Sequence, residues 1–256
     1  MYNISNISEL IKRGSATAKG GFQNEDDVVK KFNNWIKDED AQDWLDVMGY
    51  LLDEIEKVEA IKITGSHKAD VQVKIKILLR NTLAGENISV KLVSNPQGFN
   101  QIDKRKVDKY ADIWAIPDDL VVVLKLFTGE TPPIKTNVRD SRRMFLNEQR
   151  LDLQRRIVEF FKTNQIMIVT DILKGRDELA VSWMLIYQRS NKLWSLLPIS
   201  VVMNYYGTGD VYITKNGNLR IGRIGMQRKG GDRGRETAKM LQFKINPAEI
   251  IQHAND

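Results

Sequence analysis

The sequence of 256 residues contains no cysteine and only two histidines. The lack of cysteine excludes disulfides, thiolate zinc sites and a cysteine nucleophile, and two histidines leave little room for a histidine-rich metal centre. Proline is scarce, at six residues, and no apolar run approaches the length that spans a bilayer. The N-terminal residues show no basic leader followed by an apolar core, so we expect no secretory signal and a soluble, cytoplasmic protein.

Charge is unevenly distributed along the chain, although the net charge is only +6. The segment 23–60 carries 12 acidic and 4 basic residues, a net of −8, whereas 220–245 carries 8 basic and 2 acidic residues, a net of +6. A basic cluster in an otherwise balanced chain indicates a polyanionic partner, usually nucleic acid. A solvated surface segment would give the same charge pattern, so charge alone leaves both interpretations open.

Hydrophobic periodicity predicts a mixed α/β fold, and the absence of repeats and linkers favours a single domain over residues 1–256. Helices are expected over 24–35, 41–57 and 141–163. Strands are expected over 71–79, 88–93, 166–172, 183–187, 211–214 and 219–224. The run 120–127 fits either type, and 82–87 is expected to be a turn between two strands.

Three residues on the two strands joined by this turn suggest a metal site. Ser89 and Lys91 share a strand face, and Asp70 stands at the start of the preceding strand. The order is similar to a nuclease pattern in which oxygen ligands hold Mg²⁺ and a lysine orients or deprotonates a water. Other strands of alternating polarity match it too. A turn centred near 83–84 would also place Lys91 opposite about residue 76, leaving Asp70 about 20 Å away along the strand.

Two polar segments carry side chains suited to nucleic acid, because amides and arginines can read base edges and basic groups neutralise phosphates. The first segment supplies Asn95, Gln97, Phe99, Asn100, Gln101 and Lys104. The second supplies Gln227, Arg228, Lys229, Asp232, Arg233, Arg235, Gln242 and Lys244. Phe99 follows a glycine in a polar loop, where an aromatic ring either wedges between base pairs or anchors the loop to the core.

Eight stretches of the sequence, in order and nearly end to end, resemble the type II restriction endonucleases that recognise GCGC and cut after the first G. They are TAKGGFQNEDD (17–27), AQDWLDVMG (41–49), VKLVSNPQGFNQIDK (90–104), FTGETPP (127–133), RRMFL (142–146), TDILKGR (170–176), YGTGD (206–210) and QRKGGDRGRETAKMLQFKI (227–245). The resemblance implies the PD-(D/E)xK fold, a mixed sheet flanked by helices. It also implies a bacterial cytoplasmic enzyme that hydrolyses double-stranded DNA with Mg²⁺.

The resemblance also implies roles for individual residues. Asp70 corresponds to the metal-binding aspartate, Lys91 to the catalytic lysine, and the carbonyl of Val90 to a backbone metal ligand. Glu25 lies in an N-terminal helix that often lends an acid to the site. Phe99 corresponds to a ring placed against the base stack, Asn100, Gln101 and Lys104 to the recognition loop, and 227–244 to sequence that contacts DNA.

Two residues depart from the family pattern. Ala69 replaces a serine before the aspartate, and Ser89 replaces a glutamine at the position of a metal ligand. Serine is shorter and would reach the metal only through a water, so we expect weaker Mg²⁺ binding. The alternatives are therefore an active endonuclease and a decayed one that only binds DNA, with an RNA-binding module as a weaker third. A cognate DNA methyltransferase is the expected genetic partner, and a palindromic site suits either a monomer or a homodimer.

Overall fold

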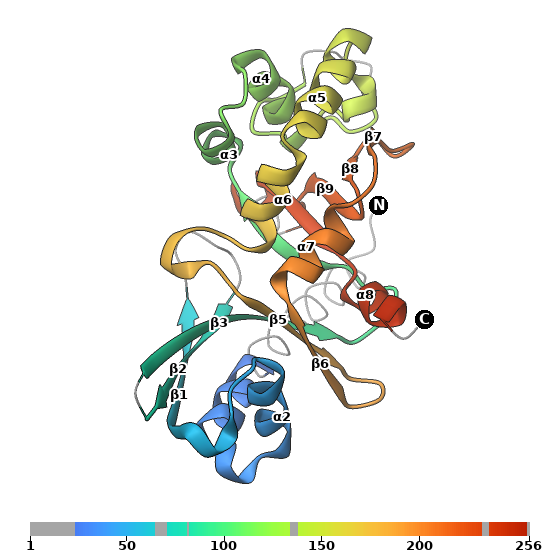
Figure 1. Ribbon diagram of the computed structural model, residues 1–256. Helices are drawn as coiled ribbons and strands as arrows, with labels where there is room; N and C mark the ends of the chain where they lie inside the picture. The colour runs from blue at the N-terminus through green and yellow to red at the C-terminus, as the bar shows by residue number, and fades with distance from the viewer. Residues whose placement is uncertain (1–23, 65–70, 81, 134–137, 232–235, 255–256) are drawn as a thin grey trace.

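A computed structural model describes residues 24–64, 71–80, 82–133, 138–231 and 236–254. Its strands form two sheets of five strands each, one in the lower half of Figure 1 and one in the upper half. The fold is mixed α/β, as the sequence predicts. No helix in these described parts is long and apolar enough to cross a bilayer.

The first sheet has the order β1-β2-β3-β5-β6. Its strands are β1 (Ile55–Thr64), β2 (Val71–Leu79), β3 (Thr82–Val93), β5 (Trp183–Gln188) and β6 (Leu193–Pro198). Only β3 and β5 pair in parallel. One face is covered by the helical residues 24–33, the short η1 (Trp35–Lys37) and α2 (Glu39–Val47), whose Phe32, Trp44 and Leu45 form a core with Val73, Ile75 and Ile88.

The second sheet is antiparallel throughout, with the order β4-β10-β9-β8-β7. Its strands are β4 (Asn100–Arg105), β7 (Val211–Ile213), β8 (Leu219–Ile221), β9 (Ile224–Arg228) and β10 (Leu241–Ile245). One face packs into the larger core, where Leu241, Phe243 and Met226 are fully buried. Because side chains alternate along a strand, the residues between these apolar ones point to the other face of the sheet, away from the core.

Helices surround the larger core (Figure 1). They are α3 (Val107–Trp114), α4 (Asp118–Thr128), α5 (Leu151–Thr163), α6 (Gln165–Leu173), α7 (Ile199–Gly207) and α8 (Pro247–Ala254). Short 3-10 turns lie at η2 (Leu52–Glu54), η3 (Leu146–Glu148), η4 (Asp177–Leu179) and η6 (Glu236–Lys239). The uncertain run 120–127 is thus helical, within α4.

The helix expected over 41–57 is wrong in its second half. The helix α2 ends at Val47, and Gly49 takes a φ of 90°, a left-handed conformation that commonly ends helices. The chain then enters β1, a strand that the periodicity missed. As an edge strand, β1 pairs with β2 alone and keeps many charged side chains, which weakens the alternation that marks a strand.

Three further boundaries differ from expectation. The run 166–172 is not a strand but lies within the helix α6, where Ile168, Ile172 and Leu173 are buried; short apolar runs rich in β-branched residues do not distinguish the two types. The helix expected over 141–163 begins only at Leu151, in α5. The strand expected over 219–224 is two strands, β8 and β9, separated by a turn at Gly222, whose φ is 54°.

The hairpin between β2 and β3 also corrects the expected turn. Leu79 pairs with Thr82, so β3 includes the residues 82–87 that were expected to form the turn. Lys76 lies opposite Gly85 rather than Lys91, and Gln72 lies opposite Ser89. The separation of about 20 Å between Asp70 and Lys91 was expected from a turn at 83–84. The observed register has no turn there, so that expected separation does not apply.

Candidate active site and nucleic-acid interface

Ser89 and Lys91 lie in β3 on the face that points away from α2. Both residues are buried, with 4% and 5% of their surface exposed. Their neighbours Ile88 and Val90 point to the opposite face and pack into the core around Trp44. Val90 can therefore contribute to the Ser89 face only through its backbone carbonyl, which fits its expected role as a backbone ligand.

Asp70, the expected metal-binding aspartate, and its neighbour Ala69 lie outside the described residues. The described part of the β2–β3 ladder begins with the pair Gln72 and Ser89. Because paired residues point to the same face, Gln72 lies beside Ser89. Its Oε1 is buried and has no hydrogen-bond partner in the part of the chain that the structure describes. An unpartnered buried carbonyl oxygen next to Ser89 fits a hard cation such as Mg²⁺.

Gln72 is a residue that the sequence reasoning missed. Its signal was present, because it stands two residues after Asp70 in an alternating strand and so shares that residue's expected face. Among the described residues, no group of three aspartate, glutamate, histidine or cysteine side chains is placed to hold a metal. A cation at this position would therefore depend on neutral oxygen ligands together with Asp70.

Glu25 lies in the helix on the opposite face of the first sheet from Ser89. Its carboxylate forms an ion pair with Lys62 of β1 at 3.1 Å, and Asp26 pairs with the same lysine at 3.0 Å. The charges of Glu25 and Asp26 raise the pKa of Lys62, although burial alone would lower it. The structure thus gives Glu25 a cationic partner in Lys62.

The two predicted recognition segments come together in the second sheet, although they are far apart in the sequence. Three glutamines, which we call the amide row, join β4, β10 and β9. The Nε2 of Gln242 donates to Oε1 of Gln101 at 2.5 Å, and the Nε2 of Gln227 lies 3.5 Å from Oε1 of Gln242. The row lies on the face opposite Leu241 and Phe243, so the sheet presents hydrogen-bonding amides away from its core.

Lysines flank the amide row. Lys104 pairs in register with Gln242, and Lys244 pairs with Gln101. Burial and the nearby charge of Lys229 lower the pKa of Lys244. Amides that donate and accept, surrounded by cations, are the groups that contact bases and phosphates in nucleic-acid interfaces.

The loop between β3 and β4 carries the remaining residues of the first segment. Phe99 is 48% exposed, so it does not anchor the loop in the core, and the guanidinium of Arg220 lies 5.8 Å from its ring centre. Asn95 and Gln97 are exposed, and the side chain of Asn95 accepts a hydrogen bond from the backbone of Gln97 at 3.0 Å. Asn100 instead holds the loop, because it donates to the carbonyl of Leu92 at 3.0 Å.

A buried ionic network fixes β4 to the helices behind it. Arg105 forms ion pairs with Asp103 and with Asp171 of α6, each at 3.0 Å. Asp171 also accepts from the indole of Trp114 at 2.9 Å and pairs with Arg176 at 2.6 Å. Burial alone would lower the pKa of Arg105, but the two carboxylates raise it. The strand that carries Gln101 and Lys104 is therefore held at its other face by paired charges.

Not all residues of the second segment join the amide row. Arg228 follows Gln227 in β9 and so points to the other face, where it donates from Nε to the carbonyl of Ala238 at 3.0 Å. Lys229 is half-buried at the end of the strand, and its backbone N–H donates to Met240. Asp232 and Arg235, together with Arg233, lie outside the described residues.

The arrangement of the two sheets and their helices is similar to that of a known class of protein. The structure is similar to a crystal structure of restriction endonuclease MspI in complex with its cognate DNA, with a TM-score of 0.61 and 15% sequence identity over 93% of this chain and 95% of that chain. The fold is thus that of a restriction endonuclease. Residues 48–251 match the R.HinP1I restriction endonuclease family, and the chain belongs to this family. No curated protein matches the chain. These findings confirm the restriction-endonuclease resemblance in the sequence.

Proposed function

We propose that this restriction endonuclease hydrolyses double-stranded DNA at GCGC, with Mg²⁺ as its cofactor. The observation that carries the proposal is the amide row, which joins the two predicted recognition segments on one sheet of a chain that belongs to this family. The similar MspI structure is a complex with cognate DNA, which adds support for DNA as the partner of this chain. Arginine and amide side chains distinguish base pairs in the major groove, and arginine in particular suits guanine.

Asp70, the side chain of Ser89 and the carbonyl of Val90 would hold the metal, with Gln72 beside them. A β2–β3 ladder continued in the described register beyond Gln72 and Ser89 would bring position 70 opposite Lys91. When bound, Mg²⁺ supplies positive charge that stabilises the negative charge gathered on the attacked phosphate. The unpartnered oxygen of Gln72 supports a site in which a neighbouring amide adds to the short Ser89.

Lys91 is the proposed catalytic residue. Its side chain is buried on the Ser89 face, where the ammonium form can orient a water and stabilise charge on the phosphate, and the neutral amine can accept a proton from the water. The Lys91 strand runs into the loop that carries Phe99, and this loop leads into β4 of the amide row. The chemistry and the recognition of bases are thus proposed to lie on consecutive parts of one chain segment.

The distribution of charge supports the same face for DNA. The acidic α2 contributes Ala41, Trp44 and Leu45 to the core on the far side of the first sheet, away from Ser89 and Lys91. Phosphates are repelled from an acidic surface and attracted to a basic one, so DNA would approach from the Lys91 side. Phe99, which is exposed at the loop, is placed for contact with the base stack.

Digestion of unmethylated DNA with and without Mg²⁺, followed by sequencing of the ends, tests this proposal. We expect discrete fragments only with Mg²⁺, and ends that share GCGC. Metal-independent cleavage would contradict the cofactor, and ends without a common sequence would contradict the site. Accumulation of nicked plasmid during the digest would indicate a monomer that cuts each strand in turn, and its absence a homodimer that cuts both. DNA treated with a cognate methyltransferase, the proposed genetic partner, should resist cleavage.

Ser89 favours one second candidate, a decayed nuclease that binds its sequence without cutting. The serine hydroxyl is shorter than the glutamine that the family resemblance places there, and metal affinity falls when ligands are lost. Specific retardation of a GCGC duplex by a protein that does not cleave it would support this candidate. Recovery of cleavage in Ser89→Gln would then identify the serine as the cause.

A further inference from the structure

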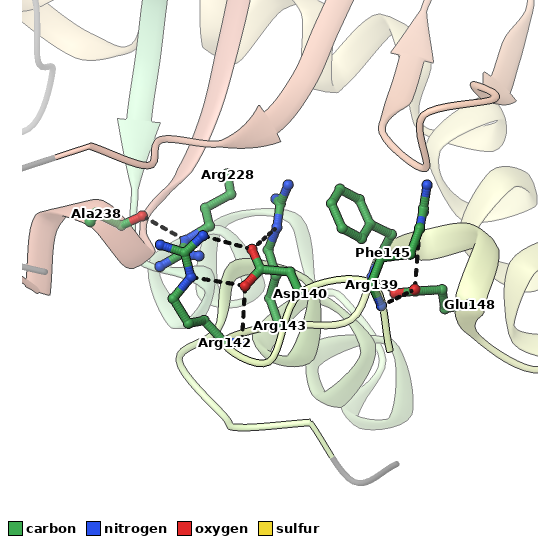
Figure 2. A network of polar contacts seen from close by, with 8 residues as sticks. All are labelled: Arg139, Asp140, Arg142, Arg143, Phe145, Glu148, Arg228 and Ala238. Atoms are coloured by element: carbon green, nitrogen blue, oxygen red, sulfur yellow. Dashed lines mark hydrogen bonds and ion pairs between the residues drawn. The ribbon is translucent and has the colours of Figure 1, made fainter. Parts of the chain in front are cut away.

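Four arginines gather where the loop before α5 meets the end of β9. They are Arg139, Arg142, Arg143 and Arg228, which we call the arginine cluster (Figure 2). Two carboxylates, those of Asp140 and Glu148, accompany them in this network. The cluster therefore carries more positive than negative charge.

The carboxylate of Asp140 is already engaged. Arg142 donates to it from Nε at 2.8 Å and from a terminal nitrogen at 3.0 Å, and Arg143 approaches it to 3.6 Å. Arg228 uses its Nε for the carbonyl of Ala238 and forms no ion pair with a carboxylate in the described parts of the chain. Burial and the charge of Arg142 both lower the pKa of Arg228, and the two guanidinium groups that Figure 2 draws beside each other repel.

The cluster is also partly withdrawn from water. The side chain of Arg143 is 15% exposed, and its guanidinium lies 4.0 Å from the ring centre of Phe145. Burial and the charge of Arg228 lower the pKa of Arg143, while burial and the charge of Arg142 lower the pKa of Arg228. Neighbouring like charges that lose water are unfavourable by themselves, so this arrangement becomes favourable when an anion binds.

The position of the cluster distinguishes it from the amide row. Arg228 and Gln227 are adjacent in β9 and point to opposite faces, so Arg228 does not extend the row of base-reading amides. Guanidinium groups bind phosphates in a forked geometry through pairs of N–H groups. The packing of Arg139 and Arg143 on Phe145, at 4.1 and 4.0 Å, holds two of these groups in place before any anion arrives.

We propose that the arginine cluster binds a phosphate of the DNA backbone, outside the base pairs that the amide row contacts. This inference rests on the proposed function, because it takes duplex DNA as the partner. A phosphate contact positions the duplex without selecting its sequence, so the cluster contributes equally to cognate and non-cognate DNA. Arg228, expected from the sequence to contact DNA, acts here on the backbone.

The salt dependence of binding tests the inference. The affinity of the wild-type protein and of Arg228→Gln is measured over a range of salt concentrations, in Ca²⁺ to prevent cleavage. The two probes are a short GCGC duplex and a matched duplex without that sequence. The slope of log affinity against log salt is negative, and loss of one phosphate contact reduces its magnitude by about 0.9. We expect this decrease on both duplexes. Arg150→Gln is the matched control, because Arg150 is exposed and pairs with Asp152, and its slope should stay at the wild-type value.

A second variant, Arg142→Gln, keeps the test valid if Arg228→Gln fails to fold. Arg142 is 73% exposed, so Arg142→Gln should fold and should reduce the magnitude of the slope as well. Wild-type slopes in both variants, or a loss confined to the GCGC duplex, would overturn the inference. Unchanged slopes together with a rise in Tm in inorganic phosphate, seen in the wild type and absent in the variants, would assign the cluster to free anions and likewise overturn it. Failure of the wild-type protein to bind either duplex would instead refute the proposed function.

Discussion

Removal of the Asp171 carboxylate, as in Asp171→Ala, should destabilise the protein through the network behind β4. Asp171 is 2% exposed and accepts hydrogen bonds from Trp114 and Arg105, at 2.9 and 3.0 Å. Loss of one partner from a buried ion pair costs about 3–5 kcal/mol, because the remaining charge stays buried without compensation. Arg105 keeps Asp103 at 3.0 Å, so we expect the lower end, about 3 kcal/mol.

Urea denaturation followed by tryptophan fluorescence measures this loss. Asp152→Ala is the control, because Asp152 is 55% exposed and pairs with Arg150 on the surface; its cost should be at most about 1 kcal/mol. The folded fraction of Asp171→Ala should also bind duplex DNA more weakly, since the network holds the strand of Gln101 and Lys104. A loss of stability no larger than that of the control would refute the argument that these buried charges fix β4.

Four further predictions concern the site. Lys91→Ala should abolish cleavage and leave specific binding intact in a gel-shift assay, and full cleavage would remove Lys91 from the mechanism. Ser89→Gln should tighten metal binding, measured as Mn²⁺ affinity by calorimetry, and raise the cleavage rate; an unchanged affinity would show that position 89 does not reach the metal. Phe99→Ala should leave Tm nearly unchanged, because the ring is 48% exposed, but should weaken duplex binding. Because the pKa of Lys244 lies below its ordinary 10.5, Lys244 loses its charge at a lower pH than other lysines, so duplex affinity should fall as the pH rises through this lowered pKa. Lys244→Gln should flatten that dependence, and an identical profile in the variant would contradict the assignment.

The sequence predicted the long elements with clear periodicity better than it predicted their boundaries. The strand at 71–79 follows the alternation that predicted it, in β2, and the apolar run 183–187 is also a strand, within β5. The sequence did not predict the strand β1, because the charged residues that an edge strand tolerates interrupt its alternation of apolar and polar side chains. The helix α6 was mistaken for a strand because its apolar residues surround most of its circumference.

The candidate site could be predicted only in part, because register decides which residues meet. A shift of the turn from 83–84 to the residues after Leu79 moves the partner of every residue in β3. Local sequence also could not show that β4 and β10 are neighbours, since Arg105 and its partner Leu241 are far apart in the chain. The amide row arises from such long-range pairing, and the arginine cluster arises where residues 139–143 meet Arg228. The amide side chains of Gln101, Gln227 and Gln242 belong to the two polar segments that the sequence predicted, and the fold brings them together; their contact with DNA stays a prediction.

The connection between β3 and β4 links the strand of the proposed catalytic lysine to a strand of the proposed base contacts. The segment 94–99 joins the strand of Lys91 to the strand of Gln101, and Asn100 ties it back to Leu92 at 3.0 Å. The side-chain amide of Asn246 donates a hydrogen bond to the carbonyl of Pro96 in the same loop, at 2.9 Å. Two side-chain hydrogen bonds therefore fix this short link to its surroundings. Under the proposed roles of Gln101 and Lys91, we expect a duplex that fits the amide row poorly to displace the strand of Lys91, so that an incorrect sequence is cleaved slowly as well as bound weakly.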